Sequence, residues 1–468
     1  MNVWIVFQDL AYVALLLIVG QLLRAKVKVL QKTLIPPGLL AGFMAFGLGP
    51  SGLGIIPFSS SLGTYSSIMV MLVFAAMPIG DKPKKEDMSG PAVGGMFFNT
   101  AGNCVLQYFI GMFVTIYILK IFFPELHDGF GLMLATAFFG GPGTAAAVGQ
   151  SFASMGWGDA AALGYACVSV GITGGILLGM VIINWGTRKK YTNYVESPKN
   201  LPAFMRTGLI PPEDQKPNTK GTISTISMDP LAFHLGLVLI PALVGYIAGN
   251  MISDKFGISI PEFCMALIFG FIFNFAYNKL KTDKYIDRGT INRISGTCTD
   301  FLIVCGLGSI SPSIVIKYAI PIFVLCFAGF IINFVWFITV GKHSSPKDWF
   351  ERDLMVWGQA CGVTATGILL MRVVDPDLRS RGIEDSGIAN LLARPIITLL
   401  TVVPPIVICN VPAGSHIVTW VTFAVFVALC IMALVFKWWR PKYVAPMGTH
   451  IHEASGGRVD VPDVEDID

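Results

Sequence analysis

The chain has 468 residues, of which 54% are hydrophobic and 13% are charged, and its net charge is +4. Soluble globular proteins carry about 25% charged residues, so this composition excludes a water-soluble globule, a disordered chain and a nucleic-acid-binding protein. It indicates a protein embedded in a lipid bilayer, with enough length for about ten spans of roughly 20 residues each.

Apolar runs predict eleven membrane spans. In chain order they lie at 4–20, 35–49, 62–80, 92–119, 162–185, 230–252, 261–277, 296–316, 318–340, 395–411 and 416–436. The first run lacks a basic leader and a small-residue cleavage signal, so we interpret it as a retained span. Two more apolar stretches, 130–158 and 354–371, are interrupted by glycines and hydroxyl residues and are not counted as spans.

Lysine and arginine residues predict the orientation, because basic loops stay on the cytoplasmic side of a membrane. If the N-terminus lies outside, the alternate loops and the C-terminal tail hold 30 of the 33 basic residues. Only Lys120, Lys255 and Lys317 then lie outside. We therefore predict an N-terminus outside and a cytoplasmic C-terminus.

A polar segment at 187–229 predicts a cytoplasmic linker between two groups of five spans, at 1–186 and 230–411. An extra transmembrane helix is predicted at 412–440 and a cytoplasmic tail at 441–468. Because each group has an odd number of spans, the second group enters the membrane upside down relative to the first. Such inverted repeats are typical of secondary transporters, although channels can share this topology.

The two interrupted stretches lie at matching places in the two halves. The first contains Gly-Gly-Pro-Gly-Thr at 140–144, which cannot continue a helix. The second reads Gly-Gln-Ala-Cys-Gly-Val-Thr-Ala-Thr-Gly at 358–367. Irregular backbone at membrane depth is tolerated only against protein or a water-filled cavity, so we predict two re-entrant hairpins that enter from opposite faces and meet. The alternative is that these glycines only allow ordinary helices to cross closely.

At these motifs the sequence resembles the glutamate:sodium symporter family of bacterial secondary transporters. The resemblance extends from the first span to about residue 411. It rests on Gly140-Gly141-x-Gly143-Thr144, on Gly358-x-x-x-Gly362-x-Thr364-x-Thr366-x-Ile368 and on Pro261-x-Phe263. The chain departs from the family pattern at Pro142, where a histidine is usual, at Ala365, where a proline is usual, and in its eleventh helix.

The resemblance implies an all-α, inverted-repeat secondary transporter of two five-helix domains, each with a re-entrant hairpin. It further implies a homodimer in the bacterial inner (plasma) membrane that takes up glutamate with sodium as the coupling ion. We expect no enzyme activity, no cofactor, no nucleic-acid partner and no metal beyond the transported sodium, since the sequence has no phosphate-binding loop, hydrolase motif or zinc-type Cys and His spacing. The alternatives are a related carboxylate or proton-coupled symporter and, less favoured, a channel.

Candidate substrate-binding residues come from both interrupted stretches. Thr144 is predicted to cap a half-helix that begins at Ala145, and the free amide groups of a helix N-terminus favour anions. Arg372 follows the second hairpin and is expected to neutralise an anionic substrate, although it also fits the charge bias without a binding role. The predicted substrate-binding set is Gly140, Gly141, Gly143, Thr144, Gly362 and Arg372.

Candidate cation-binding residues are those that offer oxygen atoms inside the membrane, which suit a hard monovalent cation. Asp300 is included because a carboxylate within a span is costly unless it is paired or binds a cation. The alternatives are that Asp300 pairs with Arg293 and that the amides at 99, 103 and 107, spaced along one helix face, hold helices together. The predicted cation-binding set is Thr364, Thr366, Asp300, Asn99 and Asn103.

The predicted orientation can be tested with single cysteines in a cysteine-free variant, one placed at 199–220 and one in the tail at 441–468. We expect an impermeant thiol reagent added outside intact cells to label neither position, because both lie on the cytoplasmic side. Both should become labelled once the membrane is permeabilised. Labelling of either position in intact cells would contradict the eleven-span topology.

Overall fold

The computed structural model describes residues 3–33, 35–50, 52–80, 91–194, 207–212, 215, 219–256, 262–310, 312–345, 347–375 and 379–442. The described residues form helices and connecting turns, with no β-strand among them. Eight of the described helices are long and apolar enough to cross a membrane. The prediction of an all-α, multi-pass membrane protein is therefore confirmed.

The first half of the chain contains the helices up to α9. In order they are α1 (Val3–Lys26), α2 (Lys28–Thr33), α3 (Pro37–Leu48), α4 (Leu62–Gly80), α5 (Pro91–Val114), the π-helical turn η1 (Thr115–Leu119), α6 (Lys120–Phe122), the 3-10 turn η2 (Asp128–Gly131), α7 (Leu132–Phe138), α8 (Gly141–Ser154) and α9 (Ala160–Arg188). Residues 81–90 and, within the predicted linker, 195–206, 213–214 and 216–218 lie outside the described residues.

The second half runs from α11 to α20. In order its elements are α11 (Pro230–Phe256), α12 (Glu262–Lys279), η4 (Asp283–Tyr285), α13 (Arg288–Gly308), α14 (Pro312–Lys317), α15 (Ala319–Trp336), η5 (Phe337–Gly341), α16 (Lys342–Ser344), α17 (Trp349–Ala360), α18 (Thr364–Val374), α19 (Gly382–Asn410) and α20 (Gly414–Val435). Pro261 and nearly all of the predicted tail lie outside the described residues.

Some predicted boundaries were wrong. The span predicted at 296–316 begins earlier, at Arg288, and ends at Gly308, because Pro312 has no amide hydrogen and starts the separate helix α14. The span predicted to begin at 395 starts at Gly382 and runs through Pro395. The predicted spans at 35–49, 261–277 and 296–316 form helices α3, α12 and α13, which are not among the eight that meet the length and hydropathy requirement.

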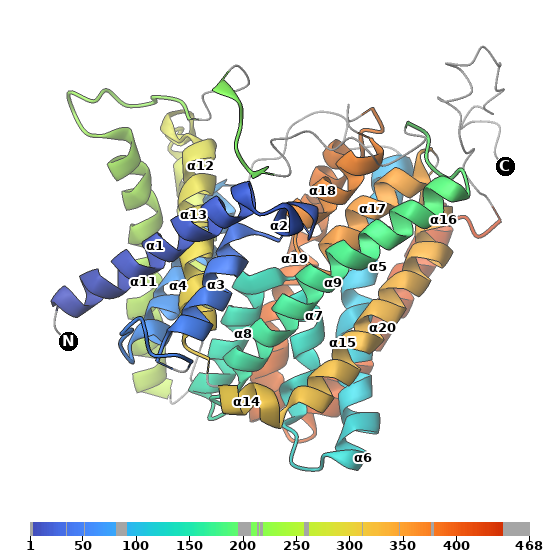
Figure 1. The fold of residues 1–468 in the computed structure, drawn as a ribbon, viewed down its shortest axis with the longest axis horizontal. Coiled ribbons are helices and arrows are strands. Elements are labelled where there is room, and N and C mark those ends of the chain that lie inside the picture. Colours follow the sequence, from blue (N-terminus) through green and yellow to red (C-terminus); the bar gives the residue numbers. More distant parts are fainter. Residues whose placement is uncertain are drawn as a thin grey trace.

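The helices form two groups, each with members from both halves of the chain (Figure 1). In one group α1 packs on α3, α4 packs on α12 and α13, and α11 packs on α12. In the other group α5 packs on α19 and α20, while α15 packs on α5 and α9. Helices α7 and α8 lie in the lower part of the view and α17 and α18 in the upper part. This arrangement brings the two interrupted stretches towards each other from opposite ends of the molecule.

Candidate functional site

The first interrupted stretch changes direction between α7 and α8 at a glycine. Gly141 has a φ of +69°, a left-handed backbone that favours glycine. Pro142 fits the first turn of α8, where no amide hydrogen is needed. The predicted cap was therefore wrong: α8 begins at Gly141, its N-cap is Gly140 without a side-chain hydrogen bond, and Thr144 lies inside the helix.

The second interrupted stretch breaks between Ala360, where α17 ends, and Thr364, where α18 begins. Val363 has an extended backbone with φ of −148° and ψ of 164°, and no side chain caps α18. Thr364 is exposed, whereas the Thr366 side chain is buried. The first turn of α18 therefore presents one accessible hydroxyl group and uncapped amide groups.

The two breaks lie against each other. A Cβ atom added to Gly141 would lie 2.6 Å from Cγ1 of Val363 and 3.3 Å from the carbonyl oxygen of Gly362. A Cβ atom added to Gly143, two residues further along, would meet no atom within 4 Å. The N-terminal ends of α8 and α18 thus meet at one place, with open space beside Gly143.

A buried amide on α5 is bonded to α17, the helix that leads into the second break. Asn99 Nδ2 donates a hydrogen bond of 2.7 Å to Asp353 Oδ1 on α17. Asn99 Oδ1 accepts a hydrogen bond of 2.6 Å from Nε1 of Trp336 on α15. All three side chains are buried. Asn99 therefore links α5 to both α15 and α17.

Two further amides on the same face of α5 reach the end of α17. Gln107 Nε2 lies 2.8 Å from the carbonyl oxygen of Ala360 and 3.0 Å from Asn333 Oδ1. Asn103 Nδ2 donates to the same Asn333 oxygen at 3.0 Å, and its own oxygen accepts from Gln107 at 2.8 Å. These bonds favour the interpretation that the amides hold helices together. They also place Gln107 at the second break, through its bond to the Ala360 carbonyl.

Sequence reasoning missed three side chains of this network, those of Asn333, Asp353 and Trp336. Asn333 is the one amide side chain within the apolar run 318–340 of the sequence. A single amide in such a run indicates a hydrogen bond to another helix, so the sequence could have identified it. Asp353 lies one residue before the predicted start of the second stretch at 354. Its neighbour Arg352 was counted only as a loop cation, but it forms a buried ion pair of 2.6 Å with Asp385 of α19.

The remaining predicted charges lie apart from this network. Asp300 is exposed on α13, and its Oδ1 lies 3.2 Å from the position of a Cβ atom on Gly38 of α3. Among the described residues, no ion pair joins Asp300 to Arg293. Arg372 lies on α18, and its buried Nε has no hydrogen-bond partner within the described part of the chain. The structure thus leaves the Asp300 carboxylate exposed, whereas the Arg372 Nε is buried without a partner among the described residues.

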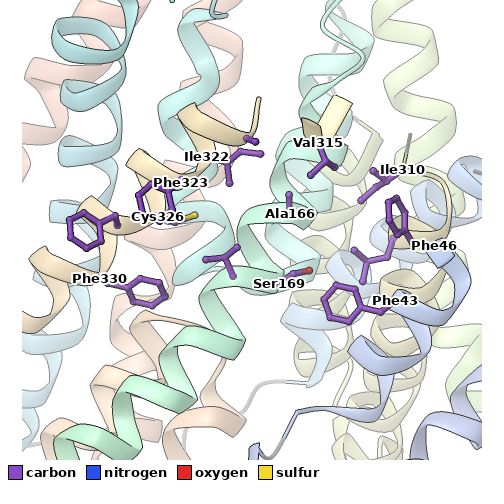
Figure 2. Close-up of a pocket in the computed structure, with 14 residues that line it drawn as sticks. Phe43, Phe46, Ala166, Ser169, Ile310, Val315, Ile322, Phe323, Cys326 and Phe330 are labelled. Atoms are coloured by element: carbon purple, nitrogen blue, oxygen red, sulfur yellow. The ribbon is translucent and has the colours of Figure 1, made fainter. Parts of the chain in front are cut away.

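An apolar groove lies elsewhere, between α3, α9, α13 and α15. Its volume is about 420 Å³. Figure 2 shows Phe43 and Phe46 on one side and Phe323 and Phe330 on the other. The hydroxyl in its lining, that of Ser169, bonds to the backbone of its own helix. Because no charged side chain lines this groove, it does not suit an anionic substrate.

The fold and the two meeting breaks define a class of protein, a helical membrane transporter of the secondary type. The chain belongs to the sodium/glutamate symporter family, whose model matches residues 5–375. Searches among curated proteins and solved structures gave no match. The family is one of transporters and not of enzymes, and membership supports symport of glutamate with sodium. The match ends before α19, whereas the resemblance was expected to reach about residue 411.

The contrast between Gly141 and Gly143 gives a matched pair of variants. We expect Gly141→Ala to lower the stability and to slow uptake at least about tenfold, because the left-handed backbone costs about 1 kcal/mol or more for alanine and the added Cβ would overlap Val363. Gly143→Ala should fold and insert normally, since the space beside it is open. Thermal stability of the purified variants would show the difference, because it does not depend on a ligand beside Gly143. Equal thermal stability of the two variants would contradict the observed geometry.

Proposed function

We propose that this protein performs sodium-coupled uptake of glutamate by alternating access. The observation that carries the proposal is the approach of Gly141 to Gly362 and Val363, since interrupted helices that meet are the binding-site element of many secondary transporters. We place the protein in the bacterial inner membrane as a homodimer, with its N-terminus outside and its C-terminus in the cytoplasm. The positive-inside bias supports this orientation.

The proposed architecture has two inverted five-helix repeats, at 1–186 and 230–411. Each repeat contributes one re-entrant hairpin, at about 130–158 and 354–371. Support comes from the packing of first-half helices on second-half helices in each of the two groups. A substrate held where the hairpins meet is then exposed to one side of the membrane at a time as the groups change their relative position.

The substrate carboxylates are proposed to bind at the N-terminal ends of α8 and α18. Amide groups in the first turn of a helix point outwards and favour anions. The open space beside Gly143 leaves room for a ligand there. The backbone can lie close to this ligand because three positions have no side chain, namely Gly140, Gly141 and Gly362. Thr144 supplies a hydroxyl group to the proposed substrate site. Arg372, whose Nε has no partner among the described residues, supplies a cationic donor.

The coupling sodium is proposed to bind near Thr364 and Thr366. Thr366 Oγ1 lies 3.1 Å from the position of a Cβ atom on Gly362, so hydroxyl and backbone oxygens gather at this break. Asp300, exposed within a predicted span, supplies a carboxylate on the cation path. Asn99 and Asn103 stay near the path, but in this conformation their oxygens accept hydrogen bonds, so we assign them to holding the second hairpin.

Uptake into liposomes that contain the purified protein tests this function. An inward sodium gradient should drive accumulation of glutamate above its external concentration, and an equal choline gradient should not. Citrate in excess should compete weakly. Accumulation driven by a proton gradient alone would favour the proton-coupled alternative, and uptake that neither saturates nor accumulates would favour a channel.

Threonine variants separate the two proposed binding sites. Thr366→Val should raise the sodium concentration for half-maximal uptake about fivefold, because one hydrogen-bonding oxygen is worth about 1 kcal/mol. Thr144→Val should instead weaken the apparent affinity for glutamate. Thr136→Val is a matched control, since among the described residues this buried hydroxyl on α7 bonds only to the Leu132 carbonyl of its own helix. Sodium and glutamate curves that match those of the wild type in both test variants would refute the site.

A further inference from the structure

Helix α20 lies beyond the family match, and the proposed transport site does not use it. It packs on α5 and α19 and runs beside α5 in Figure 1. Aromatic contacts join it to neighbouring helices: the rings of Phe109 and Phe423 are 4.9 Å apart, and those of Trp336 and Phe426 are 6.1 Å apart. The two ends of α20 also make polar contacts, each with a different part of the chain.

The N-terminal end of α20 is bonded to the turn that leads into α7. Ser415 Oγ donates a hydrogen bond of 2.8 Å to Asp128 Oδ2. Asp128 opens η2 and also forms an ion pair with Lys120. Burial raises the pKa of Asp128, whereas the hydrogen bonds from Lys120 and Ser415 lower it by a larger amount. The net shift of this pKa is therefore downward. The carboxylate is therefore a stable acceptor for Ser415.

A second polar contact holds the same end of α20. The Tyr117 hydroxyl, in η1, lies 3.1 Å from Nδ1 of His416. The same hydroxyl accepts a hydrogen bond of 3.1 Å from Nε1 of Trp420. The N-terminal end of α20 is thus fixed to both segments that precede the first hairpin, η1 and η2.

The C-terminal end of α20 is bonded to the segment that leads into α17. After the helix ends, the ring of Trp438 packs on Phe97 with centroids 5.8 Å apart. The backbone N–H of Arg440 donates a hydrogen bond of 3.0 Å to the carbonyl oxygen of His343. His343 belongs to α16, which precedes α17 by four residues, 345–348.

We propose that α20 is a brace that holds the entrance of the first hairpin at one end and the entrance of the second hairpin at the other. Because the two breaks touch at Gly141 and Val363, fixing both entrances to one continuous helix limits how far the breaks separate. Ser415 and Arg440 are therefore positioning residues. Only the transport readout of this proposal rests on the proposed function.

Hydrogen exchange of the purified full-length protein tests the N-terminal contact. In Ser415→Ala the backbone amides of 128–138 should exchange about threefold faster or more, because one hydrogen bond that closes the entrance is lost. Ser415→Thr keeps the hydroxyl and should restore slow exchange. Thr422→Val is the matched control, since within the described part of the chain its hydroxyl bonds only to the Val418 and Thr419 carbonyls of α20 itself. This control should leave 128–138 unchanged.

The C-terminal contact has its own variant. Arg440→Pro removes the donating N–H, and exchange at 342–354 should rise by a similar factor while 128–138 stays unchanged. In liposomes, both variants should raise the glutamate concentration for half-maximal uptake about threefold with little change in maximal rate, because looser hairpins must be ordered on binding.

Unchanged exchange at both entrances in Ser415→Ala and Arg440→Pro would overturn the brace. Faster exchange at the matching entrance of each variant, reversed by Ser415→Thr, would support it. If exchange responds in this way but the wild type accumulates no glutamate, the brace stands and the proposed function fails. The two proposals are therefore tested separately.

Discussion

The approach of two helix breaks is the contact on which the rest of the helical bundle depends. A helix that stops at membrane depth leaves backbone donors and acceptors unpaired, and these must face protein or water. Here the breaks face each other, with Val363 occupying the place of a Gly141 side chain. The left-handed backbone at Gly141 turns the chain at this point. A single position without a side chain therefore sets how closely the two stretches approach.

Helix α5 supports this contact through polar bonds. Its amides Asn99 and Gln107 reach Asp353 near the start of α17 and the Ala360 carbonyl at its end. Buried amides are costly without partners, and Asn333 on α15 supplies a shared acceptor. Helix α20 also packs on α5. The supports of both interrupted stretches thus converge on α5, which explains how the short helices α7, α8, α17 and α18 hold a defined position.

The sequence predicted those features that depend on local composition. Long apolar runs identified α4, α9 and α20 closely, because hydropathy and length are properties of one segment. The motif at 140–144 identified the first break but not the start of α8, since Pro142 is as acceptable in a first turn as before it. The partner of Asn99 was beyond reach, because it lies 254 positions away along the chain. Tertiary packing, and not local pattern, chose it.

A double-mutant cycle at the two breaks tests the central contact most directly. Gly141→Ala places a Cβ atom 2.6 Å from Val363 Cγ1, and Val363→Ala removes that atom. We expect the double variant to take up glutamate faster than Gly141→Ala alone, with a coupling free energy of about 1 kcal/mol or more. Strictly additive effects of the two substitutions on uptake would show that the breaks do not meet in the working transporter, and would contradict the account.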